Sequence, residues 1–343
     1  MTDPLWPPLL ARLTAGESLS APETAAAMRA IMRGEATPAQ MGGFLMALRT
    51  KGETVEELDG LAATALEFAQ PVRAPEGVVD TCGTGGDRAG TFNISTLGAI
   101  VCAGAGVVVA KHGNRAASSR CGSADLLEAL GVRIDLGPEG VESCLEEVGI
   151  GFMFAPVFHP AAGHAAVIRR ELAVPTAFNF LGPLTNPARP SAQIVGVSDH
   201  RMLPLVGEVL QRRGVQAMVF RGHDGLDELT TSGASSVLRT GGQSVTGFDL
   251  DPSEAGLPLA QPADLAGGDV QLNVAIARDV LGGQPGPRRD VVLLNAAAAL
   301  LVSGRAQDLV QGVEIAAESI DSRAALSTLD RWVDVSQRAG HDQ

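Results

Sequence analysis

The order of short β-branched runs along the chain is the feature that most limits its fold. From Val78 onward, the runs VVD, VVVA, VRIDL, QIVGV and AMVF alternate with stretches rich in Ala and Leu. Such alternation is typical of parallel strands joined by helical crossovers. We therefore expect an α/β domain with a mainly parallel central sheet over residues 73–343, in which only helices follow about Gln271.

Residues 1–72 carry a different pattern, made of repeated helix-start signals. A Ser or Thr is followed three positions later by Glu or Gln, which is the spacing of a capping box. Gly34 and Gly52 stand where helices would end. These signals predict a small helical domain over residues 1–72. The three pairs are Ser20 with Glu23, Thr37 with Gln40 and Thr54 with Glu57.

Residues 159–190 interrupt the alternation of strands and helices. Their sequence, HPAAGHAAVIRRELAVPTAFNFLGPLTNPARP, reads as a helix followed by a proline-rich loop. We expect part of residues 160–190 to pack on the helical domain.

Charge and cysteine content argue against several classes of protein. The 26 basic and 39 acidic side chains leave a formal net charge of -13, which disfavours a nucleic-acid surface. The 4 cysteines form no CxxC pair, so neither a zinc site nor a disulfide framework is indicated. The longest apolar runs fall short of the ~20 residues that span a bilayer, and no basic leader precedes them. We expect reduced, buried cysteines and a cytoplasmic location.

A glycine-rich loop follows the first expected strand. In VVDTCGTGGD, Gly83 to Gly86 and Asp87 stand at the strand end, where backbone N–H groups can turn toward a phosphate. Arg88 occupies the third glycine position of GxGxxG and no GK[ST] follows, so neither a dinucleotide fingerprint nor a P-loop is supported. A tight strand-to-helix turn is the alternative interpretation.

The motif NIST opens the apolar helix that follows this loop. Asn93, Ser95 and Thr96 lie at its N-terminus, whose free N–H groups attract anions. Simple capping of the helix would place the same residues there.

A cationic, hydroxyl-rich loop follows the second expected strand. Its sequence, KHGNRAASSRCGSADLLEALG, runs from Lys111 to Gly131, and a helix starts near Ser123. Three anion-suited segments at successive strand ends favour a phosphate site over a solvated basic loop. Donors suited to phosphate oxygens are Asn114, Arg115, Ser118, Ser119 and Arg120.

Two adjacent carboxylates lie in the segment HDGLDELTTSG. Asp227 and Glu228 stand between a strand and a turn. Mg²⁺ takes one or two protein carboxylates and completes its shell with phosphate oxygens and water. An acidic pair of this kind is otherwise a surface feature.

Together these segments resemble the anthranilate phosphoribosyltransferase family. The resemblance runs over nearly the whole chain, through GEATPAQMGGFLMALRTKGET, DTCGTGGD, FNIST, KHGNRAASSRCGSADLLEALG, FAPVFHPA, VIRREL, FNFLGPLTNPARP and DGLDELTTSG. It implies a small helical domain joined to a larger α/β domain, with the active site between them and a homodimer formed through the helical domain. It also implies transfer of a phosphoribosyl group from phosphoribosyl pyrophosphate to anthranilate, with Mg²⁺, in tryptophan biosynthesis.

The resemblance implies roles for individual residues of this sequence. Ser95, Asp227 and Glu228 would bind Mg²⁺, and Lys111, Asn114 and Arg169 would be the catalytic group. The contacts to phosphoribosyl pyrophosphate would come from Gly83, Gly86, Asp87, Thr91, Asn93, Ser95, Thr96, Lys111, Gly113, Asn114, Ser118, Ser119 and Ser123. The contacts to anthranilate would come from Gly83, His112, Asn114, Pro156, His159, Arg169 and Gly182.

Other interpretations of these residues stay open at this point. His112 and His159 would otherwise only structure their loops, and Arg169 with its neighbour Arg170 would form surface or interface ion pairs. The chain also departs from the family pattern. Many members carry a basic or larger side chain at Val157, Ala162 and Gly163, so we expect a more open outer channel for the aromatic acid.

Two rival functions remain to be separated from this one. A pyrimidine-nucleoside phosphorylase-like enzyme shares the architecture, but the glycine-rich phosphate signature of that class is missing from the sequence. A non-catalytic relative that binds nucleic acid would have lost the metal ligands and Lys111 and would carry a basic surface, and neither feature is found in this sequence.

Overall fold

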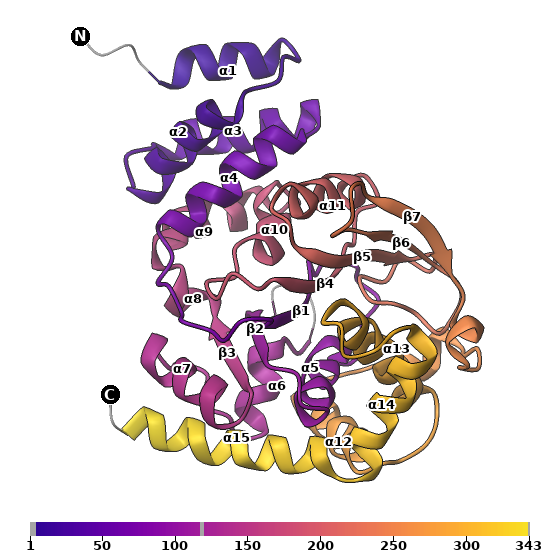
Figure 1. The fold of residues 1–343 in the computed structure, drawn as a ribbon. Coiled ribbons are helices and arrows are strands. Elements are labelled where there is room, and N and C mark those ends of the chain that lie inside the picture. The colour runs from indigo at the N-terminus through magenta and orange to yellow at the C-terminus, as the bar shows by residue number, and fades with distance from the viewer. Residues whose placement is uncertain (1–4, 117–119, 342–343) are drawn as a thin grey trace.

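Four helices build the N-terminal part of the computed structural model, which describes residues 5–116 and 120–341 (Figure 1). Thr37 and Thr54 accept the N–H groups of Gln40 and Glu57 at 3.3 Å, as the capping boxes predict. The Ser20 capping box is also present, since Glu23 accepts the Ser20 N–H at 2.8 Å, and the Ser20 hydroxyl donates to the same carboxylate. The helices are α1 (Trp6–Thr14), α2 (Ala21–Met32), α3 (Pro38–Lys51) and α4 (Val55–Glu67).

The rest of the chain is built around a seven-stranded sheet with the order β3-β2-β1-β4-β5-β6-β7. The pairs from β3 to β5 are parallel, and β6 and β7 add an antiparallel hairpin at one edge. The mainly parallel sheet is therefore confirmed, whereas the hairpin was not expected. The strands are β1 (Val79–Gly83), β2 (Val109–Gly113), β3 (Ile150–Phe154), β4 (Ala192–Gly196), β5 (Gln216–Gly222), β6 (Ser235–Arg239) and β7 (Thr246–Leu250).

One expected strand was wrong. The run VRIDL, residues 132–136, forms no strand, and β3 is the later segment IGFMF. Val132, Ile134 and Leu136 are buried in alternation, which imitates a strand. However, the Arg133 N–H donates to the Ser336 hydroxyl of the C-terminal helix, so this backbone pairs with a side chain and not with a strand.

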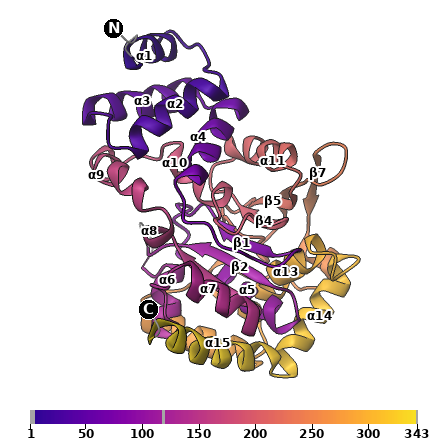
Figure 2. The same cartoon turned by 60° about the vertical axis from the view of Figure 1, so that its left-hand side comes forward.

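Helices cover both faces of the sheet. Helices α5, α13 and α15 lie on one face, and α11 lies on the other with the helical bundle beyond it (Figures 1 and 2). Across the described residues, none of the helices combines the length and apolar character needed to cross a bilayer. The remaining helices are α5 (Ile94–Gly104), α6 (Ser123–Ala129), α7 (Pro138–Glu147), α8 (Ala155–Phe158), α9 (Gly163–Leu172), α10 (Phe178–Leu181), α11 (Met202–Arg212), α12 (Val270–Leu281), α13 (Pro287–Val302), α14 (Leu309–Asp321) and α15 (Ala324–His341).

The alternation of side chains along the strands divides the core into two parts. Ile194 and Phe220 pack with α5 and α13, whereas Val195 and Val219 pack in a second core that continues into the helical bundle. Because successive residues of a strand face opposite sides, one strand supplies both cores. Helix α9 packs against α2 and α3, so it lies with the bundle.

The strand order reverses between β1 and β4. From β1 the chain goes outward to β2 and β3, then returns to the other side of β1 with β4 and β5. Open α/β sheets bind their ligands at the carboxyl ends of the strands beside such a switch point. The expected phosphate segments follow β1 and β2, next to this switch point.

The close contact between α2 and α4 gives a prediction for the helical bundle. A Cβ on Gly60 would lie 2.3 Å from Thr24 Oγ1 and 2.5 Å from Ala21 O. Gly60→Ala should therefore force the helices apart and lower the free energy of unfolding by about 1–3 kcal/mol in urea denaturation. Gly43→Ala is the control, because its Cβ would make an ordinary 3.7 Å contact with Leu10. Equal stability of the two variants would contradict the close packing.

Candidate active site

Two loops meet at the switch point between β1 and β4. β1 runs into the glycine-rich loop, and the connection after β5 brings Asp227 to the same place, where its carboxylate accepts the Gly85 N–H at 2.6 Å. A Cβ on Gly83 would lie 2.4 Å from Asp227 Oδ2, and one on Gly196 would lie 1.6 Å from Asp227 O. Space therefore requires glycine at both positions.

Three carboxylates gather here at close quarters. Burial raises the pKa of Asp227 well above its ordinary value, and the charges of Asp87 and Glu228 raise it further. Burial also raises the pKa of Glu228 to about 7, although Lys111 acts in the opposite direction. Glu228 accepts the Ser95 N–H at 3.1 Å. The mutual repulsion of these groups would be relieved by a cation.

The oxygen atoms of these carboxylates suit a cation that binds few protein ligands. Asp87 Oδ2 is buried and has no hydrogen-bond partner among the described residues. Within residues 5–116 and 120–341, no group of three or more His, Cys, Asp and Glu side chains is arranged to hold a metal by itself. Mg²⁺ fits this arrangement, because phosphate oxygens and water complete its shell.

Lys111 lies beneath the acidic pair as a buried ammonium group. Only 2% of the residue is exposed, and Nζ donates to Thr81 O at 2.5 Å and to Ser95 Oγ at 3.3 Å. Burial lowers its pKa, and the neighbouring Asp80 acts against that shift. An ammonium group has three N–H donors, so one donor remains for a ligand.

Asp80 is a site residue that sequence reasoning missed. It is fully buried in β1, and its carboxylate accepts the His112 N–H at 3.2 Å. Burial raises its pKa, and the charge of Lys111 lowers it. A carboxylate within the apolar run VVD was the signal, because buried acids are rare unless they are paired.

The cationic loop is less free than its composition indicated. Arg115 donates to Asp125 at 2.9 Å and to Glu128 at 2.8 Å, and its guanidinium lies 5.6 Å from the Phe154 ring centroid. It is therefore engaged by carboxylates and was wrongly expected to be a free phosphate donor. Ser118 and Ser119 lie outside the described residues. Asn114 and Arg120 are exposed, and Ser123 donates to Asn114 O at 3.2 Å, which closes the loop onto α6.

Asn93 joins this loop to the N-terminus of α5. Its side chain does not cap the helix: Nδ2 donates to Cys121 O at 3.1 Å, and Oδ1 accepts Asn273 Nδ2 at 3.0 Å. Asn273 of α12 was not foreseen in the sequence. In place of an Asn93 cap, the Glu228 carboxylate accepts the Ser95 N–H in the first turn of α5. Thr96 Oγ1 is buried there without a partner in the described chain.

The other expected site residues lie in or beside these loops. Gly86 and Thr91 belong to the glycine-rich segment, where Gly86 has a φ of 85° that favours glycine. Gly113 ends β2, and a Cβ there would lie 2.4 Å from Ser123 Oγ. Pro156 lies exposed in α8, directly after β3.

Two histidines form a pair: His112 is buried in β2, and His159, directly after α8, is half-buried. The rings of His112 and His159 have centroids 5.0 Å apart. Burial lowers the pKa of His112 to about 4 and that of His159 to about 3, so both are neutral at pH 7. His112 Nδ1 lies 3.1 Å from Gly182 O and must carry the proton, because a carbonyl only accepts. Both Nε2 atoms are buried without a partner among the described residues.

Arg169 and Arg170 differ in their surroundings on α9. Arg169 is partly buried over the Phe178 ring, 5.6 Å from its centroid, whereas Arg170 is exposed. Burial lowers the pKa of Arg169. No carboxylate of the described residues forms an ion pair with either side chain. Surface ion pairing, the alternative for this helix, therefore does not explain Arg169.

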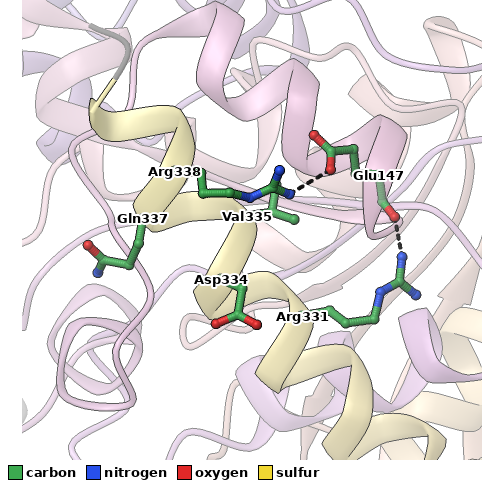
Figure 3. Close-up of a pocket in the computed structure, with 6 residues that line it drawn as sticks. All are labelled: Glu147, Arg331, Asp334, Val335, Gln337 and Arg338. Atoms are coloured by element: carbon green, nitrogen blue, oxygen red, sulfur yellow. Dashed lines mark hydrogen bonds and ion pairs between the residues drawn. The ribbon is translucent and has the colours of Figure 1, made fainter.

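A separate pocket of about 510 Å³ lies between α7 and α15 (Figure 3). It contains none of the expected site residues. Arg338 donates to the Glu147 carboxylate at 2.8 Å and Arg331 donates to the Glu147 carbonyl, so both cations are already engaged. This pocket is not part of the candidate site.

Comparison with known families covers both parts of the chain. Residues 7–69 match the helical bundle domain of a glycosyl transferase family. Residues 75–326 match the a/b domain of a glycosyl transferase family. The chain is 53% identical over 332 residues to the anthranilate phosphoribosyltransferase of Saccharopolyspora erythraea, with 95% of both chains covered.

Solved structures agree with this match. Anthranilate phosphoribosyltransferase from Thermus thermophilus superposes with a TM-score of 0.91 at 44% identity, over 96% of this chain and 99% of that chain. The Saccharomyces cerevisiae protein of the same name, in complex with PRPP and Mg, has a TM-score of 0.89 at 29% identity, over 96% and 97%. The helical domain joined to an α/β domain, which the resemblance implied, is thereby confirmed.

The approach of Gly196 to Asp227 gives a prediction for the site. Gly196→Ala should displace the Asp227 backbone, lower the free energy of unfolding by about 1–3 kcal/mol and weaken the binding of inorganic pyrophosphate with Mg²⁺. Urea denaturation and calorimetric titration measure the two effects. Gly233→Ala is the control in the same connection, because its Cβ would meet nothing within 4 Å. Unchanged binding in Gly196→Ala would contradict the proposed packing.

Proposed function

Because this chain belongs to the anthranilate phosphoribosyltransferase family, we propose that it transfers the phosphoribosyl group of 5-phosphoribosyl 1-pyrophosphate to the amino group of anthranilate. The products are N-(5-phosphoribosyl)anthranilate and pyrophosphate, in the pathway to tryptophan. One observation carries the proposal: Lys111 and Ser95 meet Asp227 and Glu228 at the carboxyl ends of the central strands.

The phosphate side of the site is assigned to the loops after β1 and β2. Backbone N–H groups of the glycine-rich loop and the remaining donor of Lys111 suit an anion. Asn93 would hold the cationic loop near α5 through its bond to Cys121 O.

The acidic pair is assigned to magnesium. Asp227, Glu228 and the Ser95 hydroxyl would hold the ion, as the unpartnered Asp87 oxygen and the raised pKa values of the pair support. When bound, Mg²⁺ would neutralise charge on the departing pyrophosphate.

The aromatic acid is assigned to the side of Arg169 and the histidines. The guanidinium has no carboxylate partner in the described chain, and its planar fork suits a carboxylate such as that of anthranilate. The Nε2 atom of His112 is an acceptor that suits an amine N–H group, because the proton of this ring is on Nδ1.

The chemistry needs positioning more than activation. The amino group of anthranilate is neutral at pH 7, so no strong base is required before it attacks C1 of the ribose. Holding the two substrates in line reproduces the advantage of intramolecular reactions, whose effective molarities reach ~10⁵ M or more. Lys111 and the N–H groups around it would stabilise charge on the leaving pyrophosphate.

The location and assembly of the protein belong to the same proposal. The four cysteines Cys82, Cys102, Cys121 and Cys144 are all buried, which supports a reducing compartment such as the cytoplasm. A homodimer formed through the helical domain is part of the same proposal.

Assaying the reaction tests the proposal. With Mg²⁺, phosphoribosyl pyrophosphate and anthranilate, the fluorescence of anthranilate should fall while one pyrophosphate is released for each molecule consumed. Glu228→Gln is the matched variant, because the amide keeps the shape but loses the charge that holds the cation. It should turn over more slowly and need more Mg²⁺. A preference for a pyrimidine nucleoside plus phosphate would overturn the assignment.

Replacing Arg169 tests the carboxylate contact. Loss of a charge-assisted hydrogen bond costs about 1.5–3 kcal/mol. Arg169→Ala should therefore raise the KM for anthranilate by about tenfold or more, while the KM for phosphoribosyl pyrophosphate hardly changes. Steady-state kinetics with each substrate varied in turn measure both constants.

Arg170→Ala is the control on the same helix. Arg170 is exposed and lies about 100° around α9 from Arg169, so its loss should leave both KM values unchanged. Equal damage to both substrates in Arg169→Ala, or an effect confined to Arg170→Ala, would show that α9 presents the other arginine to the site.

A further inference from the structure

A single amide lies inside the apolar helix α13. Asn295 has 0% exposure, and residues 291–300 around it are all buried. A buried amide is tolerated only when its donors and acceptor are bonded. Its Oδ1 accepts the Leu229 N–H at 3.0 Å, and Nδ2 donates to Leu229 O at 2.8 Å and to Val291 O at 2.9 Å.

Asn295 makes the two backbone hydrogen bonds to Leu229 that a neighbouring strand would make in a sheet. Leu229 is fully buried in the connection between β5 and β6, outside the ladder of the sheet. One side chain therefore bonds both backbone groups of this residue. Asp227 and Glu228 directly precede Leu229. Fixing the Leu229 N–H therefore also fixes the planar peptide unit between Glu228 and Leu229, which contains the Cα of Glu228.

The other contacts of the acidic pair come from ligand-facing segments. Asp227 accepts the Gly85 N–H, and Glu228 accepts the Ser95 N–H. Both donors lie in segments proposed to receive the substrate, so both contacts are exposed to rearrangement when it binds. The Leu229 contacts come instead from a helix in the core.

Helix α13 is itself fixed against α5. A Cβ on Gly98 would lie 3.7 Å from Ala296 N, and Cys102 Sγ donates to Ala296 O at 3.4 Å. Ala296 follows Asn295, so these contacts also fix the Asn295 side chain relative to α5, which carries Ser95. The distance between Ser95 and the acidic pair is thus set partly by the packing of α5 on α13.

We propose that Asn295 is a positioning residue that aims Asp227 and Glu228 toward the metal-bound pyrophosphate of the substrate. It acts through the Leu229 backbone and touches no reacting atom. This inference rests on the proposed function, because Mg²⁺ with pyrophosphate is what the pair is assigned to hold. The lone Asn in VVLLNAAAALLV is its sequence signal.

The test replaces the amide by an apolar side chain of similar size. Asn295→Leu leaves the Leu229 N–H and C=O without their partner. Calorimetric titration of the full-length protein with Mg²⁺ and inorganic pyrophosphate should show a Kd raised by about tenfold. The KM for anthranilate should stay unchanged, because Arg169 and the histidines are not in this network.

Two further variants separate positioning from stability. Asn295→Ala removes the same hydrogen bonds to Leu229 without adding bulk or a buried charge, so its Kd should be raised as in Asn295→Leu. Leu300→Ala opens a cavity in the same helix, about 140° around from Asn295. It should lower Tm without changing the Kd for pyrophosphate. If Asn295→Leu does not fold, Asn295→Ala carries the same titration.

The outcomes distinguish this inference from the proposed function. Wild-type affinity in both Asn295 variants, or equal weakening in Leu300→Ala, overturns the positioning role even when the wild type makes phosphoribosylanthranilate. A wild type that binds Mg²⁺ with pyrophosphate but makes no such product overturns the function, while a Kd raised only in the Asn295 variants still supports the role of Asn295.

Discussion

The contact between the Asp227 backbone and the ends of β1 and β4 is the constraint on which the site depends. Side chains are excluded at Gly83 and Gly196 by this approach, and the Asp227 carboxylate takes the Gly85 N–H as its partner. The contact buries acidic groups at the one point where the strand order reverses. Burial of that kind is unfavourable for charged carboxylates, which is why the pKa values of Asp227 and Glu228 are raised.

The pleat of the sheet explains how a cationic group, Arg169, is placed near the buried carboxylates. One face of the strands packs on α5 and α13, which carry Ser95 and the buried amide of Asn295. The other face shares its core with the helical bundle and with α9, which carries Arg169. The phosphate loops and the Arg169 guanidinium are thus attached to opposite layers of one sheet. A substrate pair with a polyphosphate and an aromatic acid matches that division.

Local signals predicted much of the fold because they report local physics. The caps at Thr37 and Thr54 join residues that are three positions apart. The segment 132–136 was misread because alternating burial does not reveal whether a backbone pairs with a strand or with Ser336 of α15. Arg115 was misread for a similar reason, since its partners Asp125 and Glu128 become neighbours only when the loop closes on α6.

The sequence by itself determined the class of fold and the types of group available to the site, through strand and helix periodicity and through motifs at strand ends. The family resemblance named individual residues, among them Lys111, Asp227 and Arg169, and their assigned roles stay predictions. Only the tertiary structure decided which groups are buried and which are paired. Arg115 is paired with carboxylates, whereas Arg169 lies over Phe178 without a carboxylate partner among the described residues. Asp80 and Asn295 bond residues far away in the chain. The reason is that burial and hydrogen bonding across more than 30 residues depend on packing, which no short stretch of sequence encodes.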